Sequence, residues 1–581
     1  MALFSQLSWY FLSEWRRYVG AIFLLMVIAV LQVIPPKIVG IIVDGVDNHN
    51  LSFSQVMNWV GVMVLIAIAV YLLRYFWRLW LFGASYQLAV KLRMQIYQQL
   101  NQQSSSFYHR YRTGDLIART TNDVDKVVFA AGEGVLTLVD SMVMGLAVLV
   151  MMSIQLSWEL TLISLLPMPL MAMLIKRYGD KLHSRFKTAQ ALFSSLNNQA
   201  QESLSSIRMI KSFGLEQQHA TRFEDVAKET GRQNMRVARI DALFDPTIFM
   251  AIGFANLFAV AGGSYLVLND KMTLGELTSF VMYLGQMIWP MLALAWMFNI
   301  VERGSAAYSR INSLLNEKLD MIDGDLSPKQ GRGVLSVDIE RFQYPEQTTE
   351  VLKNIHFILS PGDMLGICGM TGSGKSTLLT VIQRLYDVTE GEICFQSIPI
   401  YQLKLDEWRA RLAVVNQTPF LFSDTIAGNI ALGRPNATKD EIEAVAKLAN
   451  IHDDILRLPE GYQTQVGEKG VMLSGGQKQR ISIARALLLD AEILLLDDAL
   501  SAVDGQTEYQ ILQNLSQWRK DRTLIISAHR LSALVGATHI LVLKQGEIVE
   551  QGTHQQLISI PGWYQDMYHY QQLEAALDDD E

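Results

Sequence analysis

The stretch Gly369-Met370-Thr371-Gly372-Ser373-Gly374-Lys375-Ser376-Thr377 decides the fold of the C-terminal half of the chain. An apolar run at 364–368 precedes it and predicts a buried strand, and the sequence at 378–382 that follows is helical. A strand, a glycine-rich loop and a helix in this order form a complete P-loop. The sequence therefore predicts an α/β P-loop domain that binds phosphate groups.

The residues of this loop are suited to a triphosphate with its metal ion. Gly369, Gly372 and Gly374 permit a tight nest of backbone N–H groups, and the start of the following helix adds partial positive charge. We expect Lys375 to neutralise the β and γ phosphates, Ser376 to bind Mg²⁺ and Thr377 to donate to a phosphate. Thr371 and Ser373 lie inside the loop and are also expected to bind the nucleotide. We expect ATP and Mg²⁺ as cofactors.

Two further segments of the same half carry related chemistry. The apolar run 491–496 ends in Asp497 and Asp498, as expected of a buried parallel strand that delivers acidic groups at its end. Asp497 is suited to hold Mg²⁺ through water. The loop Leu473-Ser474-Gly475-Gly476-Gln477 enters a helix at 478–485, and its exposed N-terminus predicts a second phosphate site.

Together these segments resemble the nucleotide-binding domain of ATP-binding cassette (ABC) transporters, whose signature is the sequence LSGGQ at 473–477. The other elements stand in the family's order: Tyr344 as the aromatic that stacks on adenine, Gln417 as the Q-loop residue and a metal ligand, 501–504 as the D-loop with Asp504, and His529 as the switch histidine. A lone Tyr, Gln or His usually has a structural role. The ordered set of six signals carries the resemblance.

The resemblance covers essentially the whole chain. The stretch 464–470 resembles the loop that touches coupling helices in exporters. The segments 4–11 and 35–40 resemble, less specifically, the A subunit of bacterial heterodimeric multidrug-resistance-like exporters. A bacterial inner-membrane location, a second half-transporter chain as partner, and hydrophobic small molecules as substrates follow from this resemblance.

The N-terminal half predicts a polytopic helical membrane domain. Six apolar stretches are long enough for a hydrocarbon core of roughly 30 Å, which takes about 20 helical residues. They lie near 19–43, 56–82, 127–151, 158–175, 243–268 and 272–298. The loops at 44–55 and 152–157 contain no Lys or Arg, whereas 83–126 and 176–242 are rich in both, so both termini are expected in the cytoplasm.

Two connections between these spans are long, mostly polar and helical in pattern. We expect helices that extend far into the cytoplasm, with hairpin tips at 111–116 and 211–216 that dock on a soluble domain.

Polar residues inside spans are candidates for substrate contact, namely Gln32, Lys37, Glu133, Asp140, Asp245 and Gln286. A structural role is the stronger interpretation for most of them: Glu133 and Asp245 lie near span ends, and Pro35-Pro36 and Trp289-Pro290 more often kink a helix than contact a ligand. Met and aromatic residues between 282 and 296 form either an adaptable pocket or a packing surface.

The expected domains are an interfacial elbow helix at 1–18, a six-helix transmembrane domain at 19–315, a linker at 316–332, the nucleotide-binding domain at 333–570 and an acidic tail at 571–581. A net charge of −8 without a basic stripe argues against nucleic acid as a partner, whereas the apolar spans require a lipid bilayer. The two cysteines, Cys368 and Cys394, stand in no metal or redox motif and are expected to be reduced and buried.

One residue departs from the family's pattern. The family usually places Glu after the Mg²⁺-binding Asp, to polarise the attacking water, but here the residue is Asp498. General-base catalysis needs contact at about 2.6–3.2 Å, so the shorter side chain predicts weak hydrolysis at this chain's own site. By the same resemblance, the intact signature loop of this chain at 473–477 would complete the ATP site of the partner chain. A heterodimer with one degenerate site is expected; a homodimer in which Asp498 is the general base is the alternative.

The expected function is ATP-driven export of lipophilic or amphipathic compounds, with catalytic roles for Asp498, His529 and Gln417. A flippase for lipids or lipid-linked glycans would use the same helices. A nucleotide-gated regulator or channel subunit is an alternative from another class, favoured only by Asp498. The six spans exclude a soluble ATPase of the same family.

Overall fold

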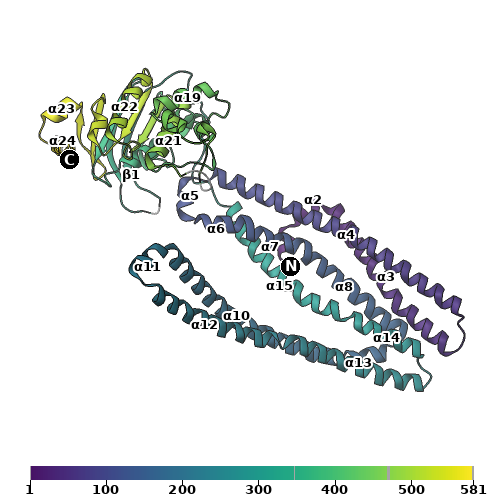
Figure 1. Ribbon diagram of the computed structural model, residues 1–581. Helices are drawn as coiled ribbons and strands as arrows, with labels where there is room; N and C mark the ends of the chain where they lie inside the picture. The colour runs from purple at the N-terminus through teal and green to yellow at the C-terminus, as the bar shows by residue number, and fades with distance from the viewer. Residues whose placement is uncertain (1, 346, 468–471, 579–581) are drawn as a thin grey trace. The chain divides into compact units, whose positions relative to one another are not determined.

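The computed structural model describes residues 2–345, 347–467 and 472–578, which form two compact units (Figure 1). The first unit comprises Met1–Gln99 and Gly114–Glu317, and the second comprises Leu100–Thr113 and Lys318–Glu581. A short segment from the N-terminal half therefore belongs to the second unit. Each unit is described by itself below.

The first unit consists of helices. Six helical stretches of the described chain are long and apolar enough to cross a membrane: Trp15–Asp47, Phe53–Gln102, Thr113–Leu156, Trp158–Ser205, Glu216–Leu268 and Leu274–Leu315. They contain the six predicted spans, except that the last helix begins two residues after 272. Helices satisfy their own backbone polar groups, which a lipid environment requires. The predicted six-helix membrane fold is confirmed.

Only two of these stretches are single helices, α3 (Trp15–Asp47) and α4 (Phe53–Gln102). The third contains α6 (Thr113–Ala118), η1 (Arg119–Asp123), α7 (Val124–Phe129), η2 (Ala130–Gly134), α8 (Val135–Val150) and η3 (Met151–Leu156), of which the η segments are π-helical. The others are α9 (Trp158–Leu165) with α10 (Pro167–Ser205), α12 (Glu216–Asp241) with α13 (Phe244–Leu268), and α14 (Leu274–Gln286) with α15 (Ile288–Leu315).

The N-terminal segment differs from the predicted single helix at 1–18. It forms α1 (Ala2–Gln6) and α2 (Ser8–Ser13), and α3 already begins at Trp15. Leu3, Leu7 and Tyr10 are fully buried, and the Tyr10 hydroxyl donates to the Ala84 carbonyl of α4. Packing against other helices thus shapes this segment, which the amphipathic pattern alone did not reveal.

Helix α3 continues through Pro35 and Pro36, and α14 donates hydrogen bonds to carbonyls beside this break in the helical pattern. Pro36 has no N–H, so the carbonyl of Gln32 loses its helical partner. The Gln286 side chain donates its Nε2 to that carbonyl at 3.1 Å. The Tyr283 hydroxyl donates to the Val33 carbonyl at 2.6 Å. These bonds fasten α14 to α3 and explain why polar residues stand inside both spans.

The long polar connections are helical, as predicted. Helices α10 and α12 run side by side and are joined through α11 (Ile207–Phe213), which Figure 1 shows at the tip of this hairpin. Gly214 ends α11 with φ +63°, the left-handed conformation that glycine adopts readily. Phe213 beside it is 72% exposed.

The second unit contains two larger sheets. The main sheet has the order β12-β11-β3-β10-β9-β6, with all neighbours parallel except β11 and β12. Its strands are β3 (Met364–Gly369), β6 (Leu412–Val415), β9 (Ile493–Asp497), β10 (Thr523–Ser527), β11 (His539–Lys544) and β12 (Glu547–Gly552). The other sheet is antiparallel, in the order β2-β1-β4-β5, with β1 (Leu335–Phe342), β2 (Leu352–Leu359), β4 (Glu390–Phe395) and β5 (Ile398–Pro399). The predicted α/β fold is confirmed.

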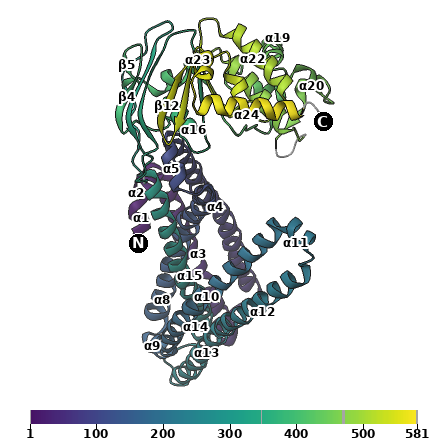
Figure 2. The ribbon, with the colours of Figure 1, turned by 90° about the vertical axis from the view of Figure 1, so that its left-hand side faces the viewer.

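Helices cover the main sheet and enclose its apolar strands in two hydrophobic cores (Figure 2). They include α16 (Lys375–Ile382), α19 (Lys439–Leu448), α21 (Gly475–Leu488), α22 (Gly505–Arg519), α23 (His554–Ser559) and α24 (Trp563–Asp578). Cys368 is fully buried on β3, but Cys394 on β4 is only partly buried, because the antiparallel sheet leaves part of that side chain open. The expectation of two buried thiols was wrong for Cys394.

One buried cation joins the linker to this fold. Arg384 is 2% exposed, and its guanidinium donates to the carbonyls of Ile322, Ile400 and Leu403 at 2.7–3.2 Å. Because the guanidinium is a rigid fork of donors, one side chain joins the linker at Ile322 to the segment 400–403.

We predict that Arg384→Lys lowers the free energy of unfolding of the second unit by about 1–3 kcal/mol, because an ammonium leaves buried carbonyls unpaired. Denaturant unfolding followed by tryptophan fluorescence measures the change. Arg434→Lys is the matched control, since Arg434 is half-exposed and, among the described residues, its side chain pairs with Glu441 on α19 and with the carbonyl of Leu488. Equal stability of both variants would contradict the assigned role of Arg384.

Candidate nucleotide site

The candidate site lies where four neighbouring parallel strands end. β3 ends at Gly369, β9 at Asp497, and β10 at Ser527, two residues before His529. β6 ends at Val415, two residues before Gln417. The carboxyl ends of parallel strands share one edge of a sheet, and this edge is the usual ligand-binding edge of such folds. The fold thus gathers residues that are more than 150 positions apart.

The P-loop adopts a backbone that requires glycine. Gly369, Gly372 and Gly374 have φ values of +139°, +80° and +104°. A Cβ at Gly369 would lie 2.1 Å from the Leu543 carbonyl oxygen, so no other residue fits there. Gly374 leads into α16, whose first residue is Lys375. The hydroxyl of Ser373 is buried and has no hydrogen-bond partner in the described structure. These features suit a loop that wraps around an anion.

Lys375 is folded back over this loop. Its Nζ donates to the carbonyls of Gly369 at 2.9 Å and Met370 at 3.1 Å, and the residue is only 6% exposed. Burial lowers the pKa of the Lys375 ammonium, because it removes water from the charged form. Phosphate oxygens beside Nζ would favour the charged form again.

Two oxygen ligands stand side by side at the metal position. Ser376 Oγ donates to Asp497 Oδ1 at 3.0 Å, joining α16 to the end of β9. Hydroxyl and carboxylate oxygens are the ligands that Mg²⁺ prefers. Gln417 is close by, since its Nε2 donates to Asp498 Oδ2 at 3.4 Å. Ser376 and Asp497 therefore fit Mg²⁺ by their chemistry and position, and Gln417 contacts the neighbouring Asp498.

Asp498 is held in an unusual backbone conformation. Its φ is +46°, a left-handed value that Asp tolerates better than most residues. Its N–H donates to the Ser527 carbonyl at 2.8 Å, and its own carbonyl accepts from Ser501 Oγ at 2.8 Å. These hydrogen bonds hold the backbone of Asp498 on both sides, so its reach depends on a side chain one methylene shorter than that of Glu.

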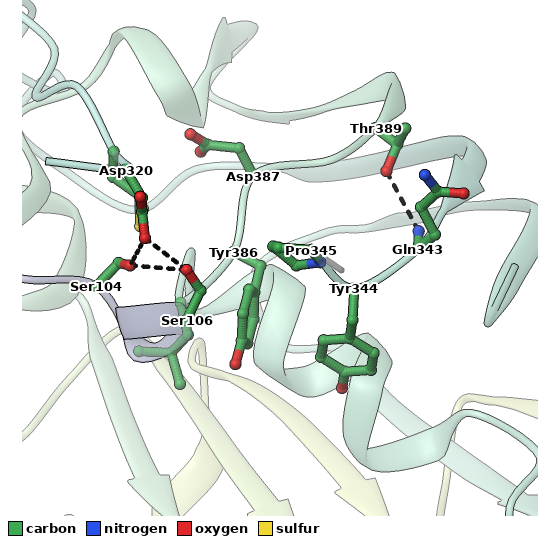
Figure 3. Close-up of a pocket in the computed structure, with 11 residues that line it drawn as sticks. Ser104, Ser106, Asp320, Gln343, Tyr344, Pro345, Tyr386, Asp387 and Thr389 are labelled. Atoms are coloured by element: carbon green, nitrogen blue, oxygen red, sulfur yellow. Dashed lines mark hydrogen bonds between the residues drawn. The ribbon is translucent and has the colours of Figure 1, made fainter. Parts of the chain in front are cut away.

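Tyr344 lies beside a cavity of about 310 Å³ (Figure 3). Its ring packs edge-on against Tyr386, with centroids 5.1 Å apart, and its hydroxyl donates to Thr377 Oγ1 at 3.0 Å. Tyr344 is thus tied to the first turn of α16. An aromatic ring at this distance from the P-loop is suited to stack on a base.

The same cavity contains a polar cluster that the sequence did not predict. Asp320 accepts hydrogen bonds from Ser104 at 2.9 Å, from Ser106, and from the Arg110 guanidinium at 2.9 Å. Burial alone would raise the pKa of Asp320, but these hydrogen bonds and the charge of Arg110 hold it below its ordinary value. Ser106 and Arg110 belong to α5 (Ser105–Arg110), directly before the predicted tip at 111–116. No local pattern marks Asp320.

The predicted signature loop has a well-defined helix start. Ser474 and Gln477 form a capping box at the N-terminus of α21, in which each side chain accepts from the other's backbone N–H. Gln479 Oε1 accepts from the Ala502 N–H at 3.1 Å, which ties this helix to the D-loop at 501–504. No hydrogen bond among the described residues joins 474–477 to the P-loop of the same chain. No sequence pattern predicts the role of Gln479.

The remaining predicted residues occupy separate positions. Asp504 caps α22 by accepting from the Thr507 N–H at 2.9 Å, and this bond lowers the pKa of Asp504. His529 is exposed, and its carbonyl accepts from Gln571 of α24 at 2.8 Å.

Of the stretch 464–470, Thr464 is buried and Gln465–Val466 form β8, which pairs with β7 (Asp424–Thr425). Residues 468–470 lie outside the described residues, as do Asp579, Asp580 and Glu581 of the acidic tail.

Comparison with known proteins covers both units. Residues 18–291 match the ABC transporter transmembrane region, and residues 352–501 match the ABC transporter domain. The chain is 67% identical over 579 residues to the "Multidrug resistance-like ATP-binding protein MdlA" of Escherichia coli strain K12, covering 100% of this chain and 98% of that protein.

More distant relatives have other printed functions. The chain is 33% identical to an "ATP-dependent lipid A-core flippase" of Syntrophus aciditrophicus, covering 89% of this chain and 86% of that protein. A solved structure of a bacterial Atm1-family ABC exporter with ATP bound has a TM-score of 0.78 at 27% identity, covering 96% of this chain and 98% of that chain.

Proposed function

The chain belongs to the ABC transporter family as a multi-pass, ATP-hydrolysing exporter subunit, and we propose that it exports lipophilic or amphipathic compounds of the multidrug type. The observation that carries this proposal is the full-length similarity to a multidrug resistance-like protein, with both units present in one polypeptide. We further propose a location in a bacterial inner membrane, with both termini and the second unit in the cytoplasm, since the Lys- and Arg-rich connections lie on that side.

Substrate-stimulated ATPase activity tests this function. The transporter is purified with the partner half with which it assembles and is reconstituted in liposomes. Amphipathic drugs should stimulate hydrolysis and accumulate inside vesicles whose ATPase units face outward. Hydrolysis and vesicle loading that do not respond to any such compound would contradict multidrug export.

We assign the nucleotide roles from the geometry of the site. The P-loop N–H groups and Lys375 bind phosphate oxygens, Tyr344 stacks on the base, and Ser376, Asp497 and Gln417 hold Mg²⁺. When bound, ATP with Mg²⁺ supplies the energy-rich phosphate bond whose cleavage drives the transport cycle. Lys375 must release the two carbonyls that it holds to reach a phosphate, a short movement of one flexible side chain.

We predict that Lys375→Ala weakens binding of a fluorescent ATP analogue at this chain's site by about 10–100-fold, because charge-assisted hydrogen bonds contribute about 1.5–3 kcal/mol each. Titration of the analogue measures the change, and thermal unfolding without nucleotide checks that the variant is folded. Lys439→Ala, at a well-exposed position on α19, is the control. Unchanged affinity in Lys375→Ala would remove the P-loop from the site.

We propose that the transporter is an asymmetric heterodimer. The fixed backbone and short side chain of Asp498 keep its carboxylate away from an attacking water, so this chain's own site binds ATP but hydrolyses it slowly. The signature loop, which has no bond to its own P-loop, completes the site of a partner that carries the usual Glu. In a homodimer both sites would lack that Glu.

Two substitutions separate these models. We predict that Asp498→Asn lowers steady-state ATPase activity of the assembly less than about threefold, whereas Gly475→Glu lowers it by about 100-fold or more, because a carboxylate would stand where the γ-phosphate docks. Gly475→Ala is the matched control. Its Cβ would lie 3.7 Å from the Ala502 Cβ, an ordinary contact, so one methyl group fits at this position within the chain.

A homodimer would behave differently. If this chain purified alone hydrolyses ATP rapidly and Asp498→Asn abolishes that activity, Asp498 is the general base and the asymmetric model is wrong. Measuring the mass of the purified assembly in detergent shows directly whether a second kind of chain is present.

We propose that the hairpin tips transmit motion between ATPase and membrane parts. Phe213 at the tip of α11 is 72% exposed, and a Cβ at the neighbouring Gly214 would meet no other atom within 4 Å. An exposed aromatic at a helix turn is suited to insert into another domain. At the other tip, Asp115 pairs with Arg119 one turn away, at 2.8 Å.

We predict that Phe213→Ala leaves nucleotide binding unchanged but removes most of the stimulation of ATPase activity by transported drugs, because it alters a mechanical contact and no phosphate ligand. ATPase activity with and without drug measures the coupling. Phe193→Ala, an exposed phenylalanine on α10 away from the tip, is the control. Normal stimulation of Phe213→Ala would exclude this tip from coupling.

Two other functions have specific support. Similarity to a lipid A-core flippase favours lipid or lipid-linked glycan flipping by the same helices. Asp498 is the one feature that favours a nucleotide-gated regulator or channel subunit. Transfer of labelled lipid between leaflets tests the first, and ATP-dependent ion conductance without net substrate transport tests the second.

A further inference from the structure

The first unit contains a cavity of about 560 Å³ between its helices. Its walls come from α3, α4, α8 and the region where α14 meets α15. The size is that of a typical pocket for a small organic ligand. Most lining side chains are apolar, among them Met63, Ile66, Met144 and Trp289, but the cavity also contains the charged groups of Arg74 and Asp140.

The charges lie at one end of an apolar wall. Met63, Ile66, Val70 and Arg74 follow one another at three- and four-residue spacing, so they share one face of α4. Arg74 lies about 16 Å along the helix from Met63. On α8, the charged Asp140 lies one helical turn from the apolar Met144, and both line the cavity. The cavity is thus amphipathic along its length.

Arg74 and Asp140 both line the cavity and interact electrostatically with each other. They are close enough for an electrostatic interaction, yet no hydrogen bond joins either one to another described residue. A charged group in a membrane-spanning helix is costly unless it is compensated. Neither residue supports the helix packing through hydrogen bonds, in contrast to Gln286.

Gln286, the other strong polar candidate in this wall, has a structural role. Its Nε2 is bound to the carbonyl that Pro36 leaves free, which fixes the side chain against α3. Arg74 and Asp140 are therefore the groups in this cavity with charge to offer a ligand.

We propose that this cavity binds a zwitterionic amphiphile, with its cationic group at Asp140, its anionic group at Arg74 and its apolar chain along Met63, Ile66 and Val70. This inference rests on the proposed export function and names the chemistry of the substrate. It applies to a membrane lipid or lysolipid and to a free amphipathic compound alike, since the headgroup chemistry is shared.

Electrostatic compensation selects the zwitterion over other amphiphiles. A ligand with one charge would pair with one of the two residues and leave the other uncompensated in a medium of low dielectric constant. A neutral ligand would leave the pair intact but gain no ionic contact. Only a ligand with both charges replaces the Arg74–Asp140 interaction completely.

Four single-chain probes of equal chain length test this selectivity: monoacylglycerol (neutral), alkylammonium (cationic), lysophosphatidylglycerol (anionic) and lysophosphatidylethanolamine (zwitterionic). Stimulation of ATPase activity is measured on the purified transporter in an uncharged maltoside detergent, so that no charged lipid competes. The zwitterion should reach half-maximal stimulation at a concentration about tenfold lower than the others, which corresponds to about 1.4 kcal/mol of differential binding.

Removal of one charge at a time should shift this selectivity in opposite directions. Asp140→Asn leaves Arg74 uncompensated, so lysophosphatidylglycerol should become the best probe by about tenfold. Arg74→Gln leaves Asp140 uncompensated, so alkylammonium should become the best probe. Arg78→Gln and Glu133→Gln are matched controls on the same two spans; neither residue lines the cavity, and both variants should keep the wild-type order.

Several outcomes would overturn the proposal. Equal stimulation of the wild type by all four probes, or a wild-type order in both charge variants, shows that these residues do not recognise the headgroup. If one variant does not fold, the other variant and the wild-type order still decide. If no amphiphile of any charge stimulates hydrolysis, export itself is in doubt, which is a different failure.

Discussion

The register of the parallel strands places the P-loop, Asp497, Asp498 and His529 at one edge of the main sheet. Ser527 of β10 lies opposite Asp497 of β9 on one side and Ile367 of β3 on the other. Ile367, Ser527 and Asp497 thus lie in one row across the sheet. The P-loop starts two residues after Ile367, Asp498 comes one residue after Asp497, and His529 comes two residues after Ser527. The strands are buried on both faces, so a slip of one residue would misplace apolar side chains throughout both cores. Hydrophobic packing thus fixes the distance between Ser376 and Asp497.

In the first unit the corresponding constraint is the satisfaction of backbone carbonyls. Pro36 frees the Gln32 carbonyl, and a span in lipid has no water to bind it. Gln286, Tyr283 and Ser279 of α14 donate to carbonyls of α3, which makes these two helices a fixed pair. Polar side chains in the spans therefore divide into two classes. Gln286 holds helices together, whereas Arg74 and Asp140 have no such bond and stand in the cavity.

Much of the fold and the site could be predicted because both leave local signals. A span needs an apolar stretch of sufficient length, so the six helices were predicted correctly. A P-loop needs glycines at fixed spacing, and the nucleotide roles assigned to Gly369 and Asp497 remain predictions. The helix predicted at 1–18 and the burial of Cys394 were wrong, since tertiary packing decides both.

Contacts between residues far apart in sequence leave no periodic signal. For this reason three hydrogen bonds could not be predicted, namely those of Gln479 with Ala502, of Gln571 with His529 and of Asp320 with Ser104. The meeting of Arg74 with Asp140 in one cavity has the same origin. Each residue follows its own helical pattern, and only the packing of α4 near α8 brings the two charges together.

The Asp320 cluster gives the nucleotide site a direct connection to the N-terminal half of the chain. Ser104 and Ser106 stand at the start of α5, and they share one cavity with Tyr344 and Tyr386 (Figure 3). The Tyr344 hydroxyl is bonded to Thr377 in the first turn of α16, so the aromatic pair is anchored to the phosphate-binding helix. A base that stacks on Tyr344 must therefore fill space bounded partly by α5. Because Arg110 and both serines donate to one carboxylate, charge-assisted hydrogen bonds hold α5 to Asp320 at the wall of this cavity.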